Sequence, residues 1–419
     1  MTTNSYAALT GSLSLSGGGT SIELPFETYL EEFTIELVTA GSWTATITLF
    51  DPSFDDLELA ILAAEADRNI ELRFGWDDPI DPLIRTFKGW ITRYRPEFQP
   101  HGTSLTLEVM ARSLGPTVVD KTVRSYKEGM RASEIVQAIA EEQGWSTSDL
   151  AGNVTIEPTE PPLETPFNTK GESAFNFLRD QILKQAKSAN GGSDYRLFFD
   201  EEGALHFHTS TFISAPTHLY RYARDMSGDV ISFAPADMSL FGVLSGGGNA
   251  RYSSSVSAQG GTAEVQSSAT GGVNGEGGVT SVDSAAKPNL GDGIHSFVNL
   301  FSRHPAEVER IARSRHEHYR RFAYQAELTV RGTHRVRPLD YVRAEVIKGN
   351  GELHYLSGNF QVFKVKHSVS VGEAWETSYE MLREGIGQQD GTEPIVASET
   401  VNPQAAGDQS DSVNIGVEG

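Results

Sequence analysis

The chain contains no cysteine among its 419 residues. This absence excludes disulfides, thiolate nucleophiles and zinc sites built on Cys ligands, and it is typical of assembly in a reducing cytoplasm. Long apolar runs are also missing. No segment approaches the roughly 20 consecutive apolar residues of a membrane helix, so we expect no stable membrane insertion. The first 19 residues lack the basic region and apolar run of a signal peptide, and we expect none.

Positive charge is scarce, because 34 Lys and Arg stand against 56 Asp and Glu, a formal net charge of −22. A surface that grips nucleic acid needs clustered cations to neutralise phosphates, so we expect no specific nucleic-acid binding. Residues 303–343 are the exception, with ten Arg against five acids. This basic segment suits either an acidic neighbouring subunit or a solvated helix face with local ion pairs.

Motifs of catalysis are missing as well. There is no Gly-x-Ser-x-Gly elbow, and the run GGGNA is not followed by the Lys-Ser/Thr of a phosphate-binding loop. Asp77, Asp78 and Asp81 lie among prolines, which predicts a turn. The acids of residues 51–58 lie at a predicted helix start, where carboxylates are favourable.

Two histidine pairs are candidates for metal binding. His206 and His208 share one face of a predicted hairpin, but no Asp, Glu or His completes the set by spacing. His316 and His318 are two residues apart on a predicted helix, so they point about 200° apart. We therefore predict no catalytic residue, no cofactor-binding residue and no metal ligand.

What is present is strand alternation, clearest from Ser357 to Leu382. A period of two predicts a hairpin with one apolar face and Lys364 and Lys366 set against two glutamates on the other. His367 lies on the apolar face, and we interpret it as a core or interface histidine bonded to a neighbour. The residues of the apolar face are Phe363, Val365, His367, Val369, Val371, Trp375, Thr377, Tyr379 and Met381.

The first 115 residues are also rich in short alternating strands, with one helical segment over residues 51–69. This pattern predicts a small barrel or a strongly curved sheet. The inward sets are Phe33, Ile35 and Leu37, then Trp43, Ala45, Ile47 and Leu49, then Leu105, Leu107 and Val109.

Residues 116–210 change period and predict a compact α+β unit. One helix ends at Gly144 and directs Ile135, Ala138 and Ile139 inward. A second helix follows, and a hairpin then turns at the sequence DEEG. The inward residues of the second helix are Phe177, Leu178 and Ile182.

The rest of the chain combines polar segments with one more helix and sheet. Residues 245–296 are dominated by Gly, Ser, Ala and Thr and predict a loop or an arm that orders against a partner. A helix is predicted over residues 303–322, followed by a strand to Val330. Residues 387–419 form an acidic polar tail that we expect to be disordered when alone.

In this order, the segments SWTATITLFDP, FKGWITRYRPEF, GMRASEIVQAIAEEQGW, YRLFFDEEGALHF and SGNFQVFKVKHSVS resemble the central baseplate hub proteins of contractile-tailed bacteriophages. These form the late control D family, and the hub part of the type VI secretion valine-glycine-repeat spike proteins is similar. The resemblance covers residues 30–385 apart from the Gly/Ser-rich stretch.

The resemblance implies an α+β, β-rich fold with two antiparallel β-barrel domains similar to the tail-tube subunit. A smaller helix–hairpin domain decorates them. The predicted divisions are a first tube-like barrel at 1–115, the α+β peripheral domain at 116–210, connecting strands at 211–244, the Gly/Ser-rich loop or arm at 245–296, a second tube-like barrel at 297–386 and an extended tail at 387–419.

The resemblance also implies a function. Three copies would supply six barrels, and this pseudo-hexameric ring would join the six-fold tail tube to the three-fold spike, with DNA passing through the lumen. Implied partners are the tail tube or tube initiator protein, the central spike, the baseplate wedge proteins and the tape measure protein. The implied location is the virion baseplate, assembled in the host cytoplasm.

Two other functions fit the sequence. A tail-associated peptidoglycan hydrolase would need only a pair of carboxylates that can be far apart in the chain. A receptor- or glycan-binding tail protein would gather exposed aromatics on a loop surface. Here Trp43, Trp90 and Trp375 fall in alternating strands, which favours core or interface positions.

Overall fold

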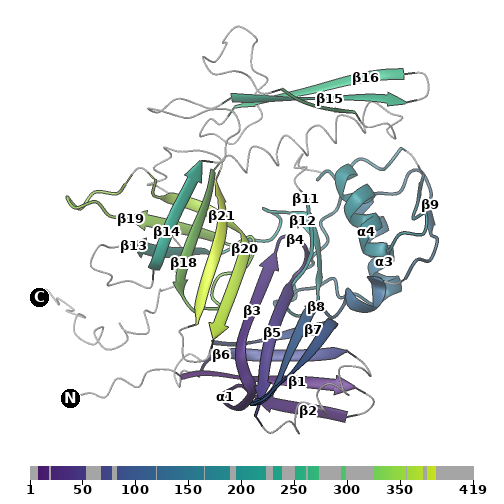
Figure 1. The fold of residues 1–419 in the computed structure, drawn as a ribbon. Coiled ribbons are helices and arrows are strands. Elements are labelled where there is room, and N and C mark those ends of the chain that lie inside the picture. The colour runs from purple at the N-terminus through teal and green to yellow at the C-terminus, as the bar shows by residue number, and fades with distance from the viewer. Residues whose placement is uncertain are drawn as a thin grey trace, which may run out of the picture.

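The computed structural model describes most of the chain outside its C-terminal tail (Figure 1). The predicted helices at 51–69 and 303–322 and the tail at 387–419 fall almost wholly outside the described residues. The described residues are 8–17, 20–52, 68–77, 83–118, 120–164, 166–188, 195–222, 230–237, 251–260, 263–272, 294–298, 324–354, 356–370 and 375–383.

One 13-stranded sheet dominates the molecule, in the order β14-β18-β21-β20-β3-β5-β8-β7-β6-β1-β2, with β19 and β13 branching from β20. Strands of the N-terminal half are β1 (Ala8–Gly17), β2 (Thr20–Pro25), β3 (Leu30–Val38), β5 (Thr44–Asp51), β6 (Asn69–Asp77), β7 (Leu83–Gln99) and β8 (Gly102–Ala111). Strands of the C-terminal half are β13 (Thr217–Tyr222), β14 (Val230–Asp237), β18 (Tyr324–Arg331), β19 (Tyr341–Val346), β20 (Gly358–Ser370) and β21 (Glu376–Arg383).

The two halves repeat one strand order. In the N-terminal half the order is β3-β5-β8-β7-β6, and in the C-terminal half it is β14-β18-β21-β20-β19. Every neighbouring pair in both series is antiparallel. The residues predicted as connecting strands, 211–244, contain β13 and β14, and β14 is the counterpart of β3. The chain therefore builds the same five-stranded arrangement twice.

The repeat extends to register. Phe33 pairs with Ile47, which pairs with Leu107; likewise Phe233 pairs with Leu328, which pairs with Tyr379. The β-bulges also fall at equivalent places, and a bulge is a local insertion that two unrelated sheets would not share by chance at every position. The bulged positions are Leu30/Glu32 in β3 and Val230/Ser232 in β14, then Ile91/Arg93 in β7 and Val362/Lys364 in β20.

The halves are joined by backbone pairing between β3 and β20, which lie side by side in Figure 1. One edge of β20 is divided between two partners. Residues 358–361 pair with β19, whereas residues 364–370 pair with β3. The same sheet therefore continues from one half into the other.

Most predicted inward positions are buried, including those of β3, β5 and β8. The prediction for β20 is wrong at its N-terminal end. The bulge at Val362/Lys364 shifts the alternation, so Phe360 and Val362 are buried before it and Val365 after it, while Phe363 is only partly buried. The bulge also leaves only Lys364 opposite a glutamate, Glu380, across the hairpin.

The peripheral unit contains the helix α3 (Ala132–Gln143), which ends at Gly144 with φ 68°, as predicted. Ile135 and Ile139 are buried, but Ala138 is exposed and Val136 is buried in its place. The inward face is therefore rotated by part of a turn from the predicted one.

The second predicted helix is irregular. It starts as α4 (Ala174–Phe177), continues through a π-helical turn, Leu178–Ile182, and ends in a 3-10 turn, Leu183–Gln185. The predicted hairpin is β11 (Tyr195–Phe199) with β12 (Leu205–Thr209). β11 also pairs in parallel with β4 (Ala40–Ser42), which attaches the peripheral unit to the first half.

The Gly/Ser-rich stretch, predicted as a loop or an arm, contains strands. β15 (Arg251–Gly260) pairs with β16 (Ala263–Gly272) and with β17 (Ile294–Val298) in a separate sheet. Backbone N–H and C=O groups can form a ladder without large side chains, so a Gly- and Ser-rich composition does not exclude strands. Among the described residues, no helix is long and apolar enough to cross a bilayer.

Candidate functional site

The junction between the halves is an aromatic cluster behind the β3–β20 seam. Phe74 of β6 lies at its centre, with ring centroids 4.6 Å from Phe33, 4.4 Å from His334 and 5.4 Å from Trp375. The indole Nε1 of Trp76 donates to the carbonyl of Gly332 at 2.7 Å, which fastens the two halves together. Edge-to-face packing of this kind adds to the stability that burial supplies.

Two histidines are buried in this junction. His334 Nε2 donates to the carbonyl of Phe74 at 3.0 Å, and His367 Nδ1 lies 3.0 Å from Thr377 Oγ1. The prediction of a buried, hydrogen-bonded His367 is confirmed. Burial, with Arg85 nearby, lowers the pKa of His334 to about 3. Burial, and then His334 and Arg85, hold the pKa of His367 well below its ordinary value, so both rings are neutral.

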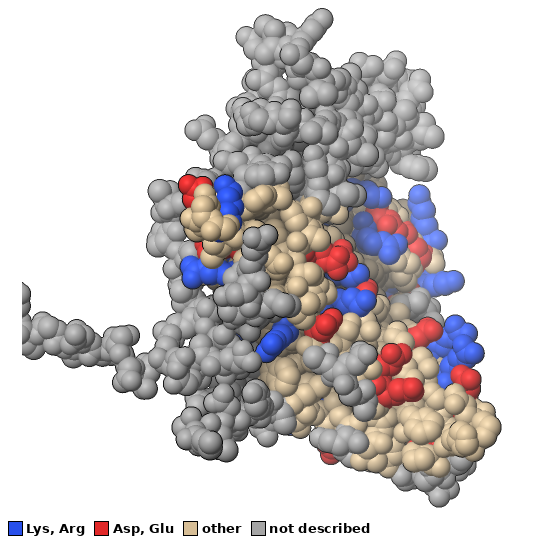
Figure 2. Space-filling model, turned by 60° about the vertical axis from the view of Figure 1, so that its left-hand side comes forward, with Lys and Arg blue, Asp and Glu red and all other residues tan. Residues whose placement is uncertain are grey.

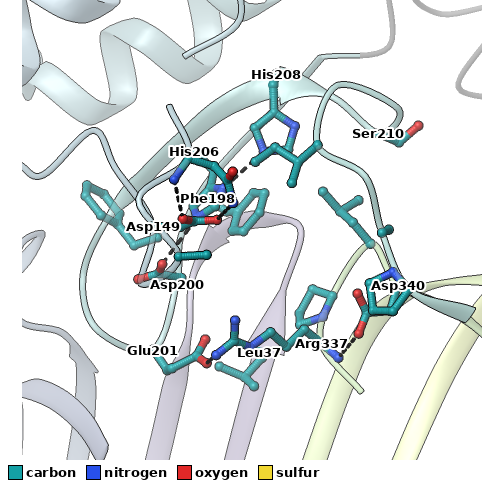
Figure 3. A pocket seen from close by; sticks show the side chains of 18 of the residues that line it. Leu37, Asp149, Phe198, Asp200, Glu201, His206, His208, Ser210, Arg337 and Asp340 are labelled. Atoms are coloured by element: carbon teal, nitrogen blue, oxygen red, sulfur yellow. Dashed lines mark hydrogen bonds and ion pairs between the residues drawn. The ribbon is translucent and has the colours of Figure 1, made fainter. Parts of the chain in front are cut away.

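A pocket of about 420 Å³ lies where the peripheral unit meets both halves (Figure 3). Its hairpin wall carries Phe198, Asp200, His206 and His208, and the opposite wall carries Arg337 and Asp340. The lining also includes three apolar residues of the segment after β12, Ile213, Ala215 and Pro216.

The histidine pair of this pocket is locked in a hydrogen-bond chain. His208 Nδ1 lies 2.7 Å from the carbonyl of Thr209, which can only accept, so Nδ1 carries the proton. Burial lowers the pKa of His208 to about 4, so its Nε2 is unprotonated and accepts from His206 Nδ1 at 3.0 Å. His206 Nε2 lies 3.2 Å from Asp200 Oδ2. The sequence did not anticipate this Asp, which the hairpin turn brings back to the pair.

This arrangement does not present metal ligands. A metal ion shared by the two rings would need a free lone pair on each facing nitrogen. Here His206 Nδ1 carries a proton and His208 Nε2 accepts it in the hydrogen bond between the rings. In the part of the chain that the structure describes, no three His, Asp or Glu side chains are grouped to hold a metal.

The carboxylates of the pocket are engaged in structural contacts. Asp149 accepts from the backbone and side chain of Asn153, at 2.8 and 3.0 Å. Asp200 accepts from the backbone N–H of Ala204 at 2.8 Å, and Asp340 from that of Arg337 at 2.8 Å.

Glu201 links three parts of the molecule. This residue lies in the turn of the peripheral hairpin, and its Oε1 is 3.0 Å from Arg85 in β7 and 3.1 Å from Arg337 beyond β18. Its carbonyl also accepts from the backbone N–H of Lys88 at 3.1 Å. Sequence reasoning missed this ion triad, and only the turn position of Glu201 signalled a side chain free to reach outward.

The predicted basic segment is described only from residue 324 onward, and there two of its cations form ion pairs within the chain. Arg337 contacts Glu201, and Arg343 contacts Glu345 at 2.9 Å. On the face drawn in Figure 2, cationic and anionic side chains are interspersed over the described residues. These observations favour local ion pairs for this part of the segment. The predicted acidic cluster at 77–81 and the pair His316 and His318 lie outside the residues whose side chains are described.

Comparison with protein-family models and with curated proteins gives no match. Comparison with solved structures does. The tail protein from Neisseria meningitidis MC58 matches at 13% identity with a TM-score of 0.56, over 90% of this chain and 97% of that one. The 43 kDa tail protein of prophage MuSo2 from Shewanella oneidensis matches at 11% identity and 0.57, over 90% and 100%. The fold is that of bacteriophage tail proteins.

The tail-protein fold extends to secretion systems. An Escherichia coli component of the type VI secretion system, described as structurally similar to the T4 tail proteins gp27 and gp5, matches at 11% identity with a TM-score of 0.50, over 85% of this chain and 74% of that one. The resemblance to baseplate hubs and type VI spike proteins that the sequence suggested is confirmed at the level of fold.

Proposed function

We propose that this chain is the structural hub of a contractile phage tail baseplate. Three copies form a ring that joins the six-fold tail tube to the three-fold central spike, and DNA leaves through the lumen. The tail-protein fold supports a structural role in the tail. We propose further that the chain is trimeric, that the trimer is a ring and that the ring encloses a channel.

The observation that carries the proposal is the internal repeat. Because β3-β5-β8-β7-β6 and β14-β18-β21-β20-β19 share order, direction, register and bulges, each chain offers two similar units. Three chains then supply six such units, which is the number needed to match a six-fold tube with a three-fold assembly.

The partners follow from this position. The tail tube or tube initiator protein and the tape measure protein adjoin the ring above, and the central spike adjoins it below. The peripheral unit, attached through β11 and Glu201, faces the wedge proteins. The net charge of −22 disfavours retention of DNA phosphates, so we assign the chain passage of DNA rather than specific binding.

A non-enzymatic role is part of the proposal. It is supported by the pocket, where carboxylates accept from backbone N–H groups or pair with arginines. A peptidoglycan zymogram of the purified chain tests this point, because clearing of the gel would favour the hydrolase alternative.

The direct test of the ring is its mass and shape. Native mass measurement on the full chain, alone and co-expressed with neighbouring tail proteins, should give about 137 kDa, three times 45.6 kDa. Negative-stain images should show rings with a central hole. A monomer under all of these conditions would contradict the proposal.

A further inference from the structure

We propose that strand β14 of one protomer pairs in antiparallel fashion with the outer half of β7 of the next protomer, repeating between chains the β3–β20 seam found within the chain. This inference rests on the proposed trimer and adds the surface and the register through which its copies join.

Among the strands that the structure describes, the two edges are unpaired in the corresponding places. β6 covers one edge of β7 only from Leu83 to Trp90, just as β19 covers β20 only over residues 358–361. The remainder of that edge of β20 holds β3. In the described sheet, β14, the counterpart of β3, is the outermost strand.

The internal repeat fixes the register. The shared bulges make Arg93 equivalent to Lys364, so Phe98 is equivalent to Val369. Phe33 pairs with Val369 in the internal seam. Transferring that pair places Phe233 opposite Phe98, and the ladder continues in the antiparallel sense on either side. The remaining pairs are Ser232 with Gln99, Ala234 with Glu97, Pro235 with Pro96, Ala236 with Arg95 and Asp237 with Tyr94.

Exposure supports the same two edges. Phe98 is 74% exposed, although its counterpart Val369 is buried at 4% by the internal seam. Ile231 of β14 is 43% exposed. Large apolar side chains left open to water at both edges favour a contact that removes them from water.

The charges differ between the two seams. Lys364 bonds Glu380 within its hairpin at 3.2 Å and Glu36 across the internal seam at 3.1 Å. The hairpin pair is repeated by Arg93 and Glu108 at 3.7 Å, but the counterpart of Glu36 is Ala236. The seam between chains therefore lacks one ion pair that the internal seam has.

Prolines also distinguish the two seams. Along an antiparallel pair of strands, hydrogen-bonded and non-hydrogen-bonded residue pairs alternate. The N–H of Thr39 donates to the carbonyl of Phe363 at 3.1 Å, so His367, four residues further along β20, is also in a hydrogen-bonded pair and its N–H points toward β3. Its counterpart is Pro96, and the residue opposite in the inferred register is Pro235. Both prolines therefore lie where a donor would point out of an open edge, which is where strands tolerate them. In the inferred seam, hydrogen-bonded pairs remain on either side of the Pro96–Pro235 pair.

Engineered disulfides test the register, because the chain has no cysteine of its own. Ala234→Cys with Glu97→Cys joins two exposed residues that would form a non-hydrogen-bonded pair, where Cβ atoms come closest. Thr34→Cys with Ser368→Cys, the same pair within the chain, is the positive control. Ala234→Cys with Arg93→Cys is the slipped-register control.

Under mild oxidation of the full chain, alone and with co-expressed tail proteins, the first variant should form a covalent trimer as the major species. The slipped control should form at least tenfold less, and the internal control should cross-link without gaining mass. Native mass measurement could show trimers that do not cross-link, or that cross-link equally in both registers. Either result would overturn the inferred surface but would leave the proposed trimeric ring standing. No trimer in any variant or in the unmodified chain would overturn the proposed ring and this seam with it.

Discussion

Glu201 lies 3.1 Å from Arg337 and, through the same carboxylate oxygen, 3.0 Å from Arg85. One side chain of the peripheral hairpin therefore holds a cation from each half of the sheet. Glu201 is 4% exposed, so its charge is compensated by these partners and not by water.

Replacing Glu201 by Gln should lower the free energy of unfolding by about 3 kcal/mol, because two partly buried guanidinium groups lose their counter-ion. Denaturant unfolding measures the effect. The neighbouring Glu202→Gln is the matched control, since its contact with Lys88 is 3.7 Å long and more exposed, and it should change stability by about 0.5 kcal/mol or less. Equal effects of the two variants would contradict the role of Glu201.

Acid should loosen the junction between the halves. His334 and His367 have folded-state pKa values below the ordinary value, His334 at about 3. The unfolded chain therefore binds protons first, and the stability these neutral rings contribute is complete above about pH 6.5 and falls as the pH is lowered, for His334 down to about pH 3. Each neutral histidine adds a slope of about 1.4 kcal/mol per pH unit in this window.

Unfolding curves between pH 7 and pH 4 test this expectation. His334→Phe should reduce the slope even if it lowers stability overall. His101→Asn, at an exposed turn, is the control for replacing a histidine outside the junction. A slope insensitive to His334→Phe would show that other groups govern the acid response.

Gly332 is a further test of the junction. A Cβ there would lie 2.0 Å from the ring of Trp375, whose carbonyl also accepts from the N–H of Gly332 at 2.7 Å. Gly332→Ala should therefore displace the indole and cost about 2 kcal/mol, with a change in tryptophan fluorescence. Gly349→Ala meets no atom within 4 Å and should be close to neutral. An unchanged melting temperature for Gly332→Ala would contradict the close packing.

Phe98 should matter to assembly and not to folding. Phe98→Ala should change the free energy of unfolding of the monomer by no more than about 0.5 kcal/mol, because the side chain is exposed. It should weaken trimer formation about tenfold or more, as measured by mass photometry across a dilution series. Val123→Ala, at a residue of the peripheral unit that is 69% exposed, should leave trimer formation unchanged. Similar losses in both variants would argue against a seam at Phe98.

Strand periodicity was enough to predict β3, β5 and β8 with their buried faces, and the spacing before Gly144 predicted α3. Bulges were beyond its reach. The bulge at Val362/Lys364 shifts the alternation without any Gly or Pro to signal it. The internal repeat was suggested by resemblance but could not be aligned from the sequence, because pairs such as Leu107 and Tyr379 share only a buried position.

The candidate site was less predictable. His206 and His208 were recognised as one strand face, but their link to Asp200 depends on how the hairpin turns back. The Glu201 contacts join residues 116 and 136 positions apart in the chain, from Arg85 and to Arg337. Such contacts depend on how three parts of the molecule pack together, and a local sequence pattern carries no information about that packing.

Pro96 and Pro235 affect how readily a subunit that has not yet assembled pairs with other copies. A chain with a donor strand edge at one end and a receptive edge at the other could add copies without limit and grow into insoluble fibres. With no N–H to offer at the middle of either edge, a newly made subunit gains little from joining a stray neighbour. In the proposed ring, this weakened edge pairing would discourage open-ended growth by strand addition and would favour closure at three protomers.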